Sequence, residues 1–213
     1  MKKIVLIGGG GHSKVIIDII KSNNDFEIVG ITEKNSMLKK INGIPILGDD
    51  SILDKLFNQG VEYAFICIGI SKGINLRNTL YNKVKKIGFK IPTLIHRQAI
   101  ISPYAKIGQG SCIMAGAIIN SNVQIGENSV INTGSIIEHD CVIGNNTFIS
   151  PGAILAGNVI VKNNSFIGMG SKIIEGKTIG NNVTIGAGAV VIDDIPDNCI
   201  AVGVPAKVIK KKE

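Results

Sequence analysis

The sequence predicts a two-part fold, with an α/β domain over residues 1–92 followed by a parallel β-helix over residues 93–213. Three observations predict it. Short apolar runs alternate with helical patterns in the first part, a large aliphatic residue recurs at every sixth position in the second, and 26 glycines accompany an apolar content of 45% that includes only 4% aromatic residues. A core of Ile and Val with many glycines indicates stacked strands and tight turns rather than a helical bundle.

The first part alternates strands with helices. We expect strands at 3–7, 27–31, 44–47 and 61–68, one helix beginning near Ser13, and further helices at 49–58 and 75–87. In the first helix Val15, Ile16, Ile19 and Ile20 form an apolar stripe. This alternation predicts a parallel sheet with helices packed on it.

Four glycines, Gly8 to Gly11, follow the first strand and precede the first helix. The backbone N–H groups of such a loop can hold a phosphate group. The spacing is not GxGxxG, and turns of this kind are often only structural. At the end of the second strand, the acid that would bind a ribose occurs in the altered context Thr32-Glu33. Both departures argue against a dehydrogenase.

The second part is a six-residue repeat. From Ile95 to Val191 every sixth residue is Ile, Leu or Val, and the residue four positions later is nearly always small, with Lys177 as an exception. This repeat is typical of a parallel β-helix, in which each hexapeptide supplies one strand and one turn, so that three walls use 18 residues per coil and give about five to six coils. Glycine follows the large residue at 108, 126, 144, 168, 180 and 186. We interpret these as turn glycines that allow positive φ.

Charge and cysteine content exclude several classes of protein. The net charge is +7, but no basic stripe with interleaved aromatic residues indicates nucleic-acid binding. The four cysteines are far apart and form no CxxC pair, which argues against a zinc site and a disulfide scaffold. The sequence shows neither a leader pattern nor an apolar run of membrane-spanning length. We therefore expect a cytoplasmic protein that uses no metal and binds neither nucleic acid nor membrane.

One of the three histidines, His139, lies between two acidic residues. His139 has Glu138 and Asp140 on either side, and the inward direction of Ile137 places His139 and Asp140 in a turn at a corner of the prism. There both side chains can face outward and meet. A carboxylate bonded to one imidazole nitrogen fixes the tautomer and raises the basicity of the other nitrogen. His139 is therefore the candidate general base, with an attacking amine or hydroxyl group as the proton donor.

Several motifs resemble a known family. They are GGGGHSK at 8–14, ICIG at 66–69, LIH at 94–96, NTGSIIEHDCVIG at 132–144 and VGVPAK at 202–207. Together they make the chain similar to the sugar acetyltransferases of the sialic acid O-acetyltransferase and UDP-4-amino-sugar N-acetyltransferase family, over essentially its whole length. The resemblance implies a Rossmann-like first domain and a left-handed coil, a hand that periodicity alone does not give.

The resemblance also implies roles for particular residues. His139 would be the base, Asp140 its orienting acid and Asn132 a neighbour of the site, which would lie between the prisms of a homotrimer. Acetyl-CoA would contact Phe148, Gly168, Met169, Gly186 and Ala187. Many relatives have His at the position of Phe148, so one hydrogen bond to the cofactor would be lost or replaced. For Met169 and Ala187, wall packing is an equally good interpretation.

The acceptor would be a nucleotide-linked sugar held by the first domain. The resemblance assigns it Gly10, Gly11, His12, Thr32, Glu33 and Gly69. Relatives often carry two adjacent Asp residues where this chain has Thr32-Glu33, and Lys34 adds a positive charge. The identity of the nucleotide therefore stays open.

Three hypotheses about function follow. The first is direct transfer of acetyl from acetyl-CoA to the amino group of a nucleotide-linked amino-deoxy sugar, because no cysteine or serine is visibly paired with His139. The second uses the same machinery to acetylate a hydroxyl group of sialic acid or a related sugar. The third is a non-catalytic β-helix that serves as a binding module, and the Glu138-His139-Asp140 cluster argues against it.

Overall fold

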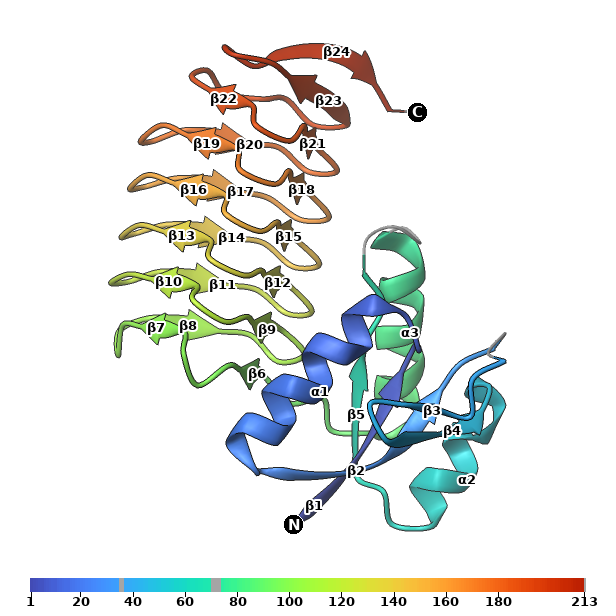
Figure 1. The fold of residues 1–213 in the computed structure, drawn as a ribbon. Helices are drawn as coiled ribbons and strands as arrows, with labels where there is room; N and C mark the ends of the chain where they lie inside the picture. The colour runs from blue at the N-terminus through green and yellow to red at the C-terminus, as the bar shows by residue number, and fades with distance from the viewer. Residues whose placement is uncertain (35–36, 70–73, 213) are drawn as a thin grey trace. The chain divides into compact units, whose positions relative to one another are not determined.

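The protein consists of two compact units. A computed structural model describes residues 1–34, 37–69 and 74–212, and it divides the chain into Met1–Arg97 and Gln98–Glu213. Figure 1 shows the helices and the open sheet of the first unit and the stacked coils of the second. Each unit is built from the elements that the sequence predicts, with differences at particular residues.

The first unit is Rossmann-like and contains a sheet with the order β3-β4-β2-β1-β5. Its strands are β1 (Lys2–Ile7), β2 (Phe26–Thr32), β3 (Lys40–Ile41), β4 (Ile44–Gly48) and β5 (Tyr63–Ile66). As predicted, β1 pairs in parallel with β2 and β5, and β2 with β4. The two-residue strand β3 is antiparallel to β4 and was not predicted. Because the parallel strands end at one edge, the loops after β1, β2 and β5 lie together there.

Helices and one short strand complete the first unit. They are α1 (Gly11–Asn23), the 3-10 helix η1 (Asp50–Ile52), α2 (Leu53–Asn58), α3 (Ile74–Ile87) and β6 (Leu94–Ile95). The helix predicted over 49–58 is thus split, with a 3-10 turn that begins where the Asp49 side chain accepts the Ser51 N–H at 2.9 Å.

The apolar stripe of α1 differs from the prediction at one residue. Ile16, Ile19 and Ile20 are buried as expected, and Ile17 is buried with them, but Val15 is 39% exposed. Successive residues of a helix are about 100° apart, so Val15 falls outside the stripe that Ile16 and Ile20 define, whereas Ile17 closes it on the other side.

The second unit is a left-handed parallel β-helix with three walls. Wall 1 consists of β7 (Ile100–Ile101), β10 (Ile118–Ile119), β13 (Ile136–Ile137), β16 (Ile154–Leu155), β19 (Lys172–Ile173) and β22 (Val190–Val191). Wall 2 consists of β8 (Lys106–Ile107), β11 (Gln124–Ile125), β14 (Val142–Ile143), β17 (Ile160–Val161) and β20 (Thr178–Ile179). Wall 3 includes β9 (Cys112–Ile113), β12 (Val130–Ile131), β15 (Phe148–Ile149), β18 (Phe166–Ile167), β21 (Thr184–Ile185), β23 (Cys199–Val202) and the antiparallel β24 (Lys207–Lys211).

The pairing of these strands confirms the 18-residue coil. Ile118 pairs with Ile136, and Ile136 pairs in turn with Ile154, each partner one coil further along the chain. The large repeat residues point inward, and from Ile113 to Val191 none of them is more than 4% exposed. The aliphatic repeat is therefore the core of the prism.

The glycines that follow the large residues have a different role from the one predicted. None of those at 108, 126, 144, 168, 180 and 186 has positive φ. Instead, a Cβ atom at these positions would lie only 2.3–2.7 Å from an atom of the neighbouring coil, so glycine is needed for close stacking of the coils. In most turns, positive φ occurs later, for example at Gly134 and Asn146. The interpretation as positive-φ turn glycines was wrong.

Candidate active site

The predicted catalytic residues His139 and Asn132 lie in turns at two different corners of the β-helix. We call the turns between walls 1 and 2, which include residues 138–141 and 156–159, the His139 corner. The turns between walls 3 and 1, which include residues 132–135, 150–153, 168–171 and 186–189, form the Asn132 corner. The strand β13 separates Asn132 from His139 within one chain.

At the His139 corner an acid braces the imidazole. Nδ1 of His139 lies 2.8 Å from Oδ2 of Asp140, and both side chains are about half exposed. This hydrogen bond raises the pKa of His139 above its ordinary 6.5, and the negative charges of Asp140, Glu138 and Glu175 add to the effect. The same bond lowers the pKa of Asp140, so the carboxylate stays ionised. The remaining nitrogen, Nε2, is the one that can accept a proton from a substrate.

A second side chain holds Asp140 from the preceding coil. Nδ2 of Asn122 donates to Oδ1 of Asp140 at 3.2 Å and further lowers the pKa of that carboxyl group. Asn122, Asp140, Tyr104, Lys106 and Gln124 line a hollow of about 280 Å³ beside the pair. Sequence reasoning missed Asn122, although its position 18 residues before Asp140 is one coil away and was available as a signal.

Cys141, the nearest thiol in the sequence, is directed into the prism. Its Sγ donates to the carbonyl of Ala156 at 3.1 Å, and burial raises the pKa of the thiol to about 11. A thiol in this state is a poor nucleophile at neutral pH. The turn therefore offers a base but no cysteine nucleophile.

The residues predicted to contact acetyl-CoA gather along wall 3 and the Asn132 corner. Phe148 is 9% exposed, with its ring 5.8 Å from that of Phe166, whereas Met169 is 60% exposed and Ala187 is also at the surface. The side-chain Oδ1 of Asn132 accepts the Thr133 N–H at 2.8 Å. The predicted contacts of Gly168 and Gly186 stay predictions, and both glycines also permit close stacking, because a Cβ at either position would clash with the next coil.

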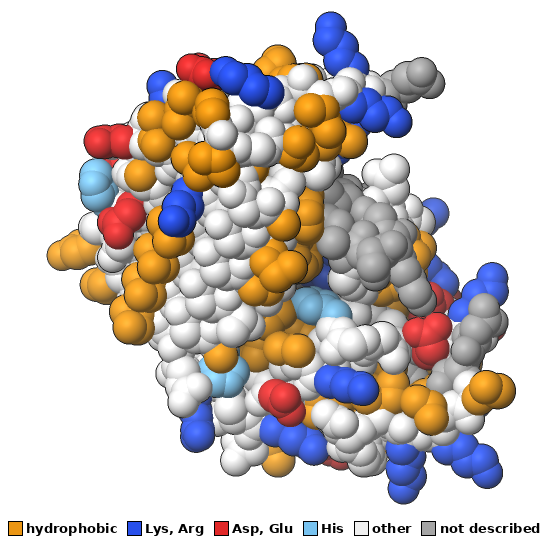
Figure 2. Space-filling view, turned by 45° about the horizontal axis from the view of Figure 1, so that its top comes forward, with side chains coloured by type: hydrophobic (Ala, Val, Ile, Leu, Met, Phe, Trp, Pro, Cys, Tyr) orange, Lys and Arg blue, Asp and Glu red, His pale blue; other side chains and the backbone are white. Residues whose placement is uncertain are grey.

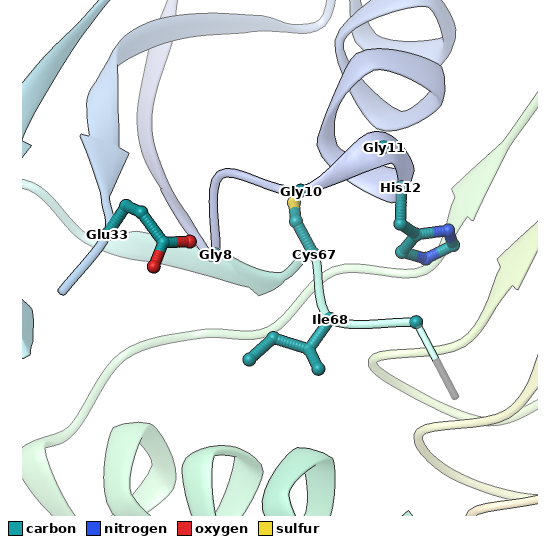
Figure 3. A pocket seen from close by; sticks show the side chains of 8 residues that line it. Gly8, Gly10, Gly11, His12, Glu33, Cys67 and Ile68 are labelled. Carbon is teal, nitrogen blue, oxygen red and sulfur yellow. The ribbon is translucent and has the colours of Figure 1, made fainter. Parts of the chain in front are cut away.

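A pocket in the first unit collects most of the residues predicted to bind the acceptor. It has a volume of about 210 Å³ and is lined by Gly8, Gly10, Gly11, His12, Glu33, Cys67, Ile68 and Gly69. Figure 3 shows Glu33 and His12 on opposite sides of the glycine loop, with Cys67 and Ile68 between them. The loops after β1, β2 and β5 supply these residues, as expected at the carboxyl edge of a parallel sheet.

The N-terminus of α1 opens at this pocket without a cap. The N-cap residue Gly10 makes no side-chain hydrogen bond, the first turn has no acidic residue, and there is open space at the Cα atoms of Gly10 and Gly11. Free N–H groups and the positive end of the helix dipole favour an anion at such a position.

His12 differs sharply from His139. Its ring is half-buried, but Nε2 is inaccessible to water and has no hydrogen-bond partner within the described residues. Burial, together with the positive charge of Arg77, lowers the pKa of His12 to about 3, so the ring is neutral. Arg77, which sequence reasoning missed, is itself buried and donates from Nη1 to the carbonyls of Ile66 at 2.7 Å and Ile68 at 3.1 Å.

Thr32 and Glu33 line a second hollow of about 420 Å³ with Lys34, Asp50 and Leu80 among its other residues. The hydroxyl of Thr32 is fully buried and donates to Oδ1 of Asp50 at 2.5 Å, while Oε2 of Glu33 accepts the Gly9 N–H at 2.7 Å. Asp50 was not among the predicted site residues. It follows β4, at the same edge as Thr32, and that position was its signal in the sequence.

Within residues 1–34, 37–69 and 74–212, no group of three or more His, Cys, Asp or Glu side chains could hold a metal ion. Within the same ranges, none of the helices combines the length and the hydropathy needed to cross a bilayer. Four cysteines are buried and form no disulfide, namely Cys67, Cys112, Cys141 and Cys199.

A Rossmann-like unit joined to a left-handed β-helix with an acid-braced histidine at one corner defines a hexapeptide-repeat acyltransferase. Comparison with known proteins specifies the family. Residues 3–84 match the PglD N-terminal domain, and residues 104–139, 122–157, 140–175 and 158–193 match the bacterial transferase hexapeptide repeats. The chain is 38% identical to PerB from Caulobacter crescentus, solved with CoA and GDP-perosamine, with a TM-score of 0.91 over 98% of this chain and 97% of that one.

Two further sugar acetyltransferases are similar to this chain. The acetyltransferase domain of PglB from Neisseria gonorrhoeae, solved with acetyl coenzyme A, is 34% identical with a TM-score of 0.91, over 98% of this chain and 99% of that chain. A UDP-N-acetylbacillosamine N-acetyltransferase from Bacillus subtilis is 34% identical over 116 residues, which span 54% of this chain and about half (52%) of that protein. The chain belongs to the hexapeptide-repeat sugar acetyltransferases of the sialic acid O-acetyltransferase and UDP-4-amino-sugar N-acetyltransferase family, as the resemblance predicted.

Proposed function

We propose that the chain transfers the acetyl group of acetyl-CoA directly to the amino group of a nucleotide-linked amino-deoxy sugar, with His139 as general base. The observation that carries this proposal is the 2.8 Å hydrogen bond between Nδ1 of His139 and Asp140, which leaves Nε2 as the proton acceptor. A GDP-perosamine N-acetyl transferase from Caulobacter crescentus, 36% identical to this chain, was solved with CoA and GDP-perosamine as a variant in which a histidine is replaced by alanine.

The proposed reaction is a single displacement through a tetrahedral intermediate. The amine attacks the thioester carbonyl and forms the new C–N bond, Nε2 of His139 takes the amine proton, and the C–S bond then breaks to release CoA as the thiol or thiolate. The negative charge of Asp140 stabilises the imidazolium that forms. The inward, high-pKa thiol of Cys141 favours this direct route over an acyl-enzyme.

The pocket of the first unit is proposed to hold the diphosphate of the acceptor. The uncapped N-terminus of α1, the open space at Gly10 and Gly11, and the buried positive charge of Arg77 all favour an anion there. The neutral His12 ring has an unsatisfied Nε2 that a phosphate oxygen or sugar hydroxyl could satisfy after a small movement. Glu33, which directly follows β2, stands where Rossmann-like domains bind a ribose hydroxyl.

We propose a homotrimer because the site is divided between two corners of each chain. The outward residues of wall 1 include Ile100, which is 65% exposed, and the half-buried Ile118, Ile136 and Ile154. Figure 2 shows hydrophobic side chains in a line along one side of the β-helix. When three prisms pack around a threefold axis with wall 1 inward, the His139 corner of one meets the Asn132 corner of the next.

That arrangement would bring acetyl-CoA to the base. The exposed Met169 and the surface residue Ala187 offer an apolar lining for the cofactor at the Asn132 corner, and Asn132 would face the neighbouring His139. We also place the protein in the cytoplasm, where its four buried cysteines, none of which forms a disulfide, stay reduced. Light scattering of the purified protein checks the trimer, and a monomer at working concentration would contradict this part of the proposal.

One assay tests the reaction. Purified protein is mixed with acetyl-CoA and either GDP- or UDP-linked amino-sugars or free sialic acid, and release of the CoA thiol is followed. We expect turnover with at least one nucleotide-linked amino-sugar. Free sialic acid should not be acetylated. Turnover with sialic acid alone would establish O-acetylation instead, and unchanged activity of His139→Ala would remove the histidine from the mechanism.

A further inference from the structure

Gly157 occupies the same turn position as His139, one coil further along the chain. The strand pairs Ile136 with Ile154 and Ile137 with Leu155 fix this 18-residue register, and the Asn158 N–H donates to the His139 carbonyl at 3.0 Å. Gly157 is buried, although it lies in a surface turn. The feature that distinguishes it from the other turn glycines is its neighbour, which is the imidazole of His139.

A side chain at this position would collide with the proposed base. A Cβ atom on Gly157 would lie 2.6 Å from Cε1, 2.8 Å from Nε2 and 3.2 Å from Nδ1 of His139. These three ring atoms are the ones nearest to the added Cβ. The clash is therefore with the imidazole of His139 and not with the backbone of an adjacent coil. By contrast, the glycines at 108, 126, 144, 168 and 180 meet backbone atoms of the adjacent coil.

The backbone itself does not require glycine here. Gly157 is absent from the positive-φ residues, so alanine can adopt its conformation without strain. It also falls outside the glycines that directly follow a large repeat residue, because Ala156 stands between it and Leu155. Neither turn conformation nor coil stacking explains the glycine, whereas contact with the ring does.

We propose that Gly157 is a positioning residue for catalysis. Because glycine has no side chain, it leaves the space that the His139 imidazole occupies while Asp140 holds Nδ1. The inference rests on the proposed function of His139. The Cα of Gly157 lies close to Cε1 and Nε2 of the ring, and the bond to Asp140 holds Nδ1, so the ring is fixed at both ends. A displaced ring would carry Nε2 away from the line of proton transfer, and a misplacement of about 1 Å can lower a rate by roughly 100-fold.

The test is a double-mutant cycle of Gly157→Ala and His139→Ala, with kcat and KM measured for acetyl-CoA and for the best amino-sugar nucleotide of the panel. We expect Gly157→Ala to lower kcat by about 100-fold with little change in either KM. In the His139→Ala background the added methyl group should have no further effect, because the ring that it displaces is gone. A further loss of kcat, or a raised KM, in the double variant would overturn the inference, since the methyl group would then act on substrate.

A second measurement does not depend on activity. The chain has only three histidines, so the pKa of His139 can be followed by NMR titration. In Gly157→Ala the bond to Asp140 should be broken and the pKa of His139 should fall toward 6.5; an unchanged value would overturn the inference. Gly126→Ala is the matched control, because its Cβ would meet Asn145 and should lower the melting temperature without changing the pKa of His139.

Stability separates a positioning role from simple misfolding. If Gly157→Ala by itself lowers the melting temperature, the added replacement His139→Ala should restore it. The reason is that the methyl group clashes with the His139 ring, which the double variant lacks. Loss of folding that persists in the double variant would overturn the inference. Failure of the proposed function looks different, since His139→Ala would then keep its activity whatever residue stands at 157.

Discussion

His139 and His12 are the same residue type in opposite environments. His139 lies at an exposed corner, is bonded to Asp140, and has a pKa raised above 6.5. His12 lies in the first turn of α1 near a buried arginine, has an Nε2 atom without a partner among the described residues, and has a pKa lowered to about 3. The first is arranged to exchange a proton near neutral pH, whereas the second stays neutral and can only give or accept a hydrogen bond.

The contrast shows that the surroundings of a histidine decide its chemistry. A carboxylate partner favours the imidazolium, while burial and a neighbouring cation disfavour it. In the proposed function, proton transfer therefore takes place at the β-helix and the Rossmann-like unit binds the acceptor. Substitutions at the two sites should therefore separate into effects on kcat and effects on KM.

Removal of the base should have the largest effect. His139→Ala is expected to lower kcat by roughly 100-fold to 10,000-fold, the usual contribution of a general base, with a near-normal KM for the nucleotide sugar. Steady-state thiol-release kinetics measure both constants. His96→Ala, at the remaining histidine, serves as the control and should keep its kcat.

Asp140→Asn should have the next largest effect. Loss of the carboxylate should lower kcat by about 10-fold or more, because the imidazolium is less stabilised. The bond to Asp140 raises the pKa of His139, so its loss should move the acid limb of the kcat–pH profile to lower pH, toward 6.5. Glu138 and Glu175 remain and keep part of the shift. A limb that stays in place or moves to higher pH would contradict the role of Asp140.

His12→Gln should change binding rather than chemistry. The loss of the imidazole should raise the KM of the nucleotide sugar by about 10-fold, because a tenfold loss of affinity corresponds to the free energy of one or two hydrogen bonds. The value of kcat should stay nearly unchanged. Because the pKa of His12 is about 3, its ring stays neutral above pH 5, and acceptor affinity should not titrate with it between pH 5 and 8. Calorimetric titration of the acceptor over this range checks both points.

Asn122→Ala should have the smallest effect. Its side chain supports one oxygen of Asp140 at an exposed position, so its loss should lower kcat by about threefold. The pKa of Asp140 should rise slightly when this hydrogen bond is removed, which NMR of the carboxyl carbon can detect. An effect as large as that of Asp140→Asn would mean that Asn122 contacts substrate itself.

Much of the fold was predictable because the repeat is local. Each hexapeptide specifies one inward aliphatic residue and one turn, so the run from Ile95 to Val191 predicts the walls and the core without knowledge of the tertiary structure. The parallel sheet of the first unit followed in the same way from alternating patterns. The errors occurred where the pattern was short, as at β3, or ambiguous, as at Val15.

The candidate site was predictable only in part. His139 and Asp140 are adjacent in sequence, and their hydrogen bond follows from turn geometry. Asn122, Asp50 and Arg77 belong to the sites through contacts that span from 9 to 18 residues and depend on side-chain direction. The sequence likewise did not predict that the glycines allow the coils to stack closely, because the distance between coils cannot be derived from the sequence of a single turn.

The two-unit architecture, the prism and the histidine–aspartate pair could all be derived from local sequence, because they depend on residues close together in the chain. Three contacts or placements became known only from the folded chain: Gly157 faces the His139 ring, Thr32 is bonded to Asp50, and Asn132 and His139 lie at different corners. A repeat fixes which residues point inward. The neighbours of an outward side chain depend on how successive coils and loops pack against one another.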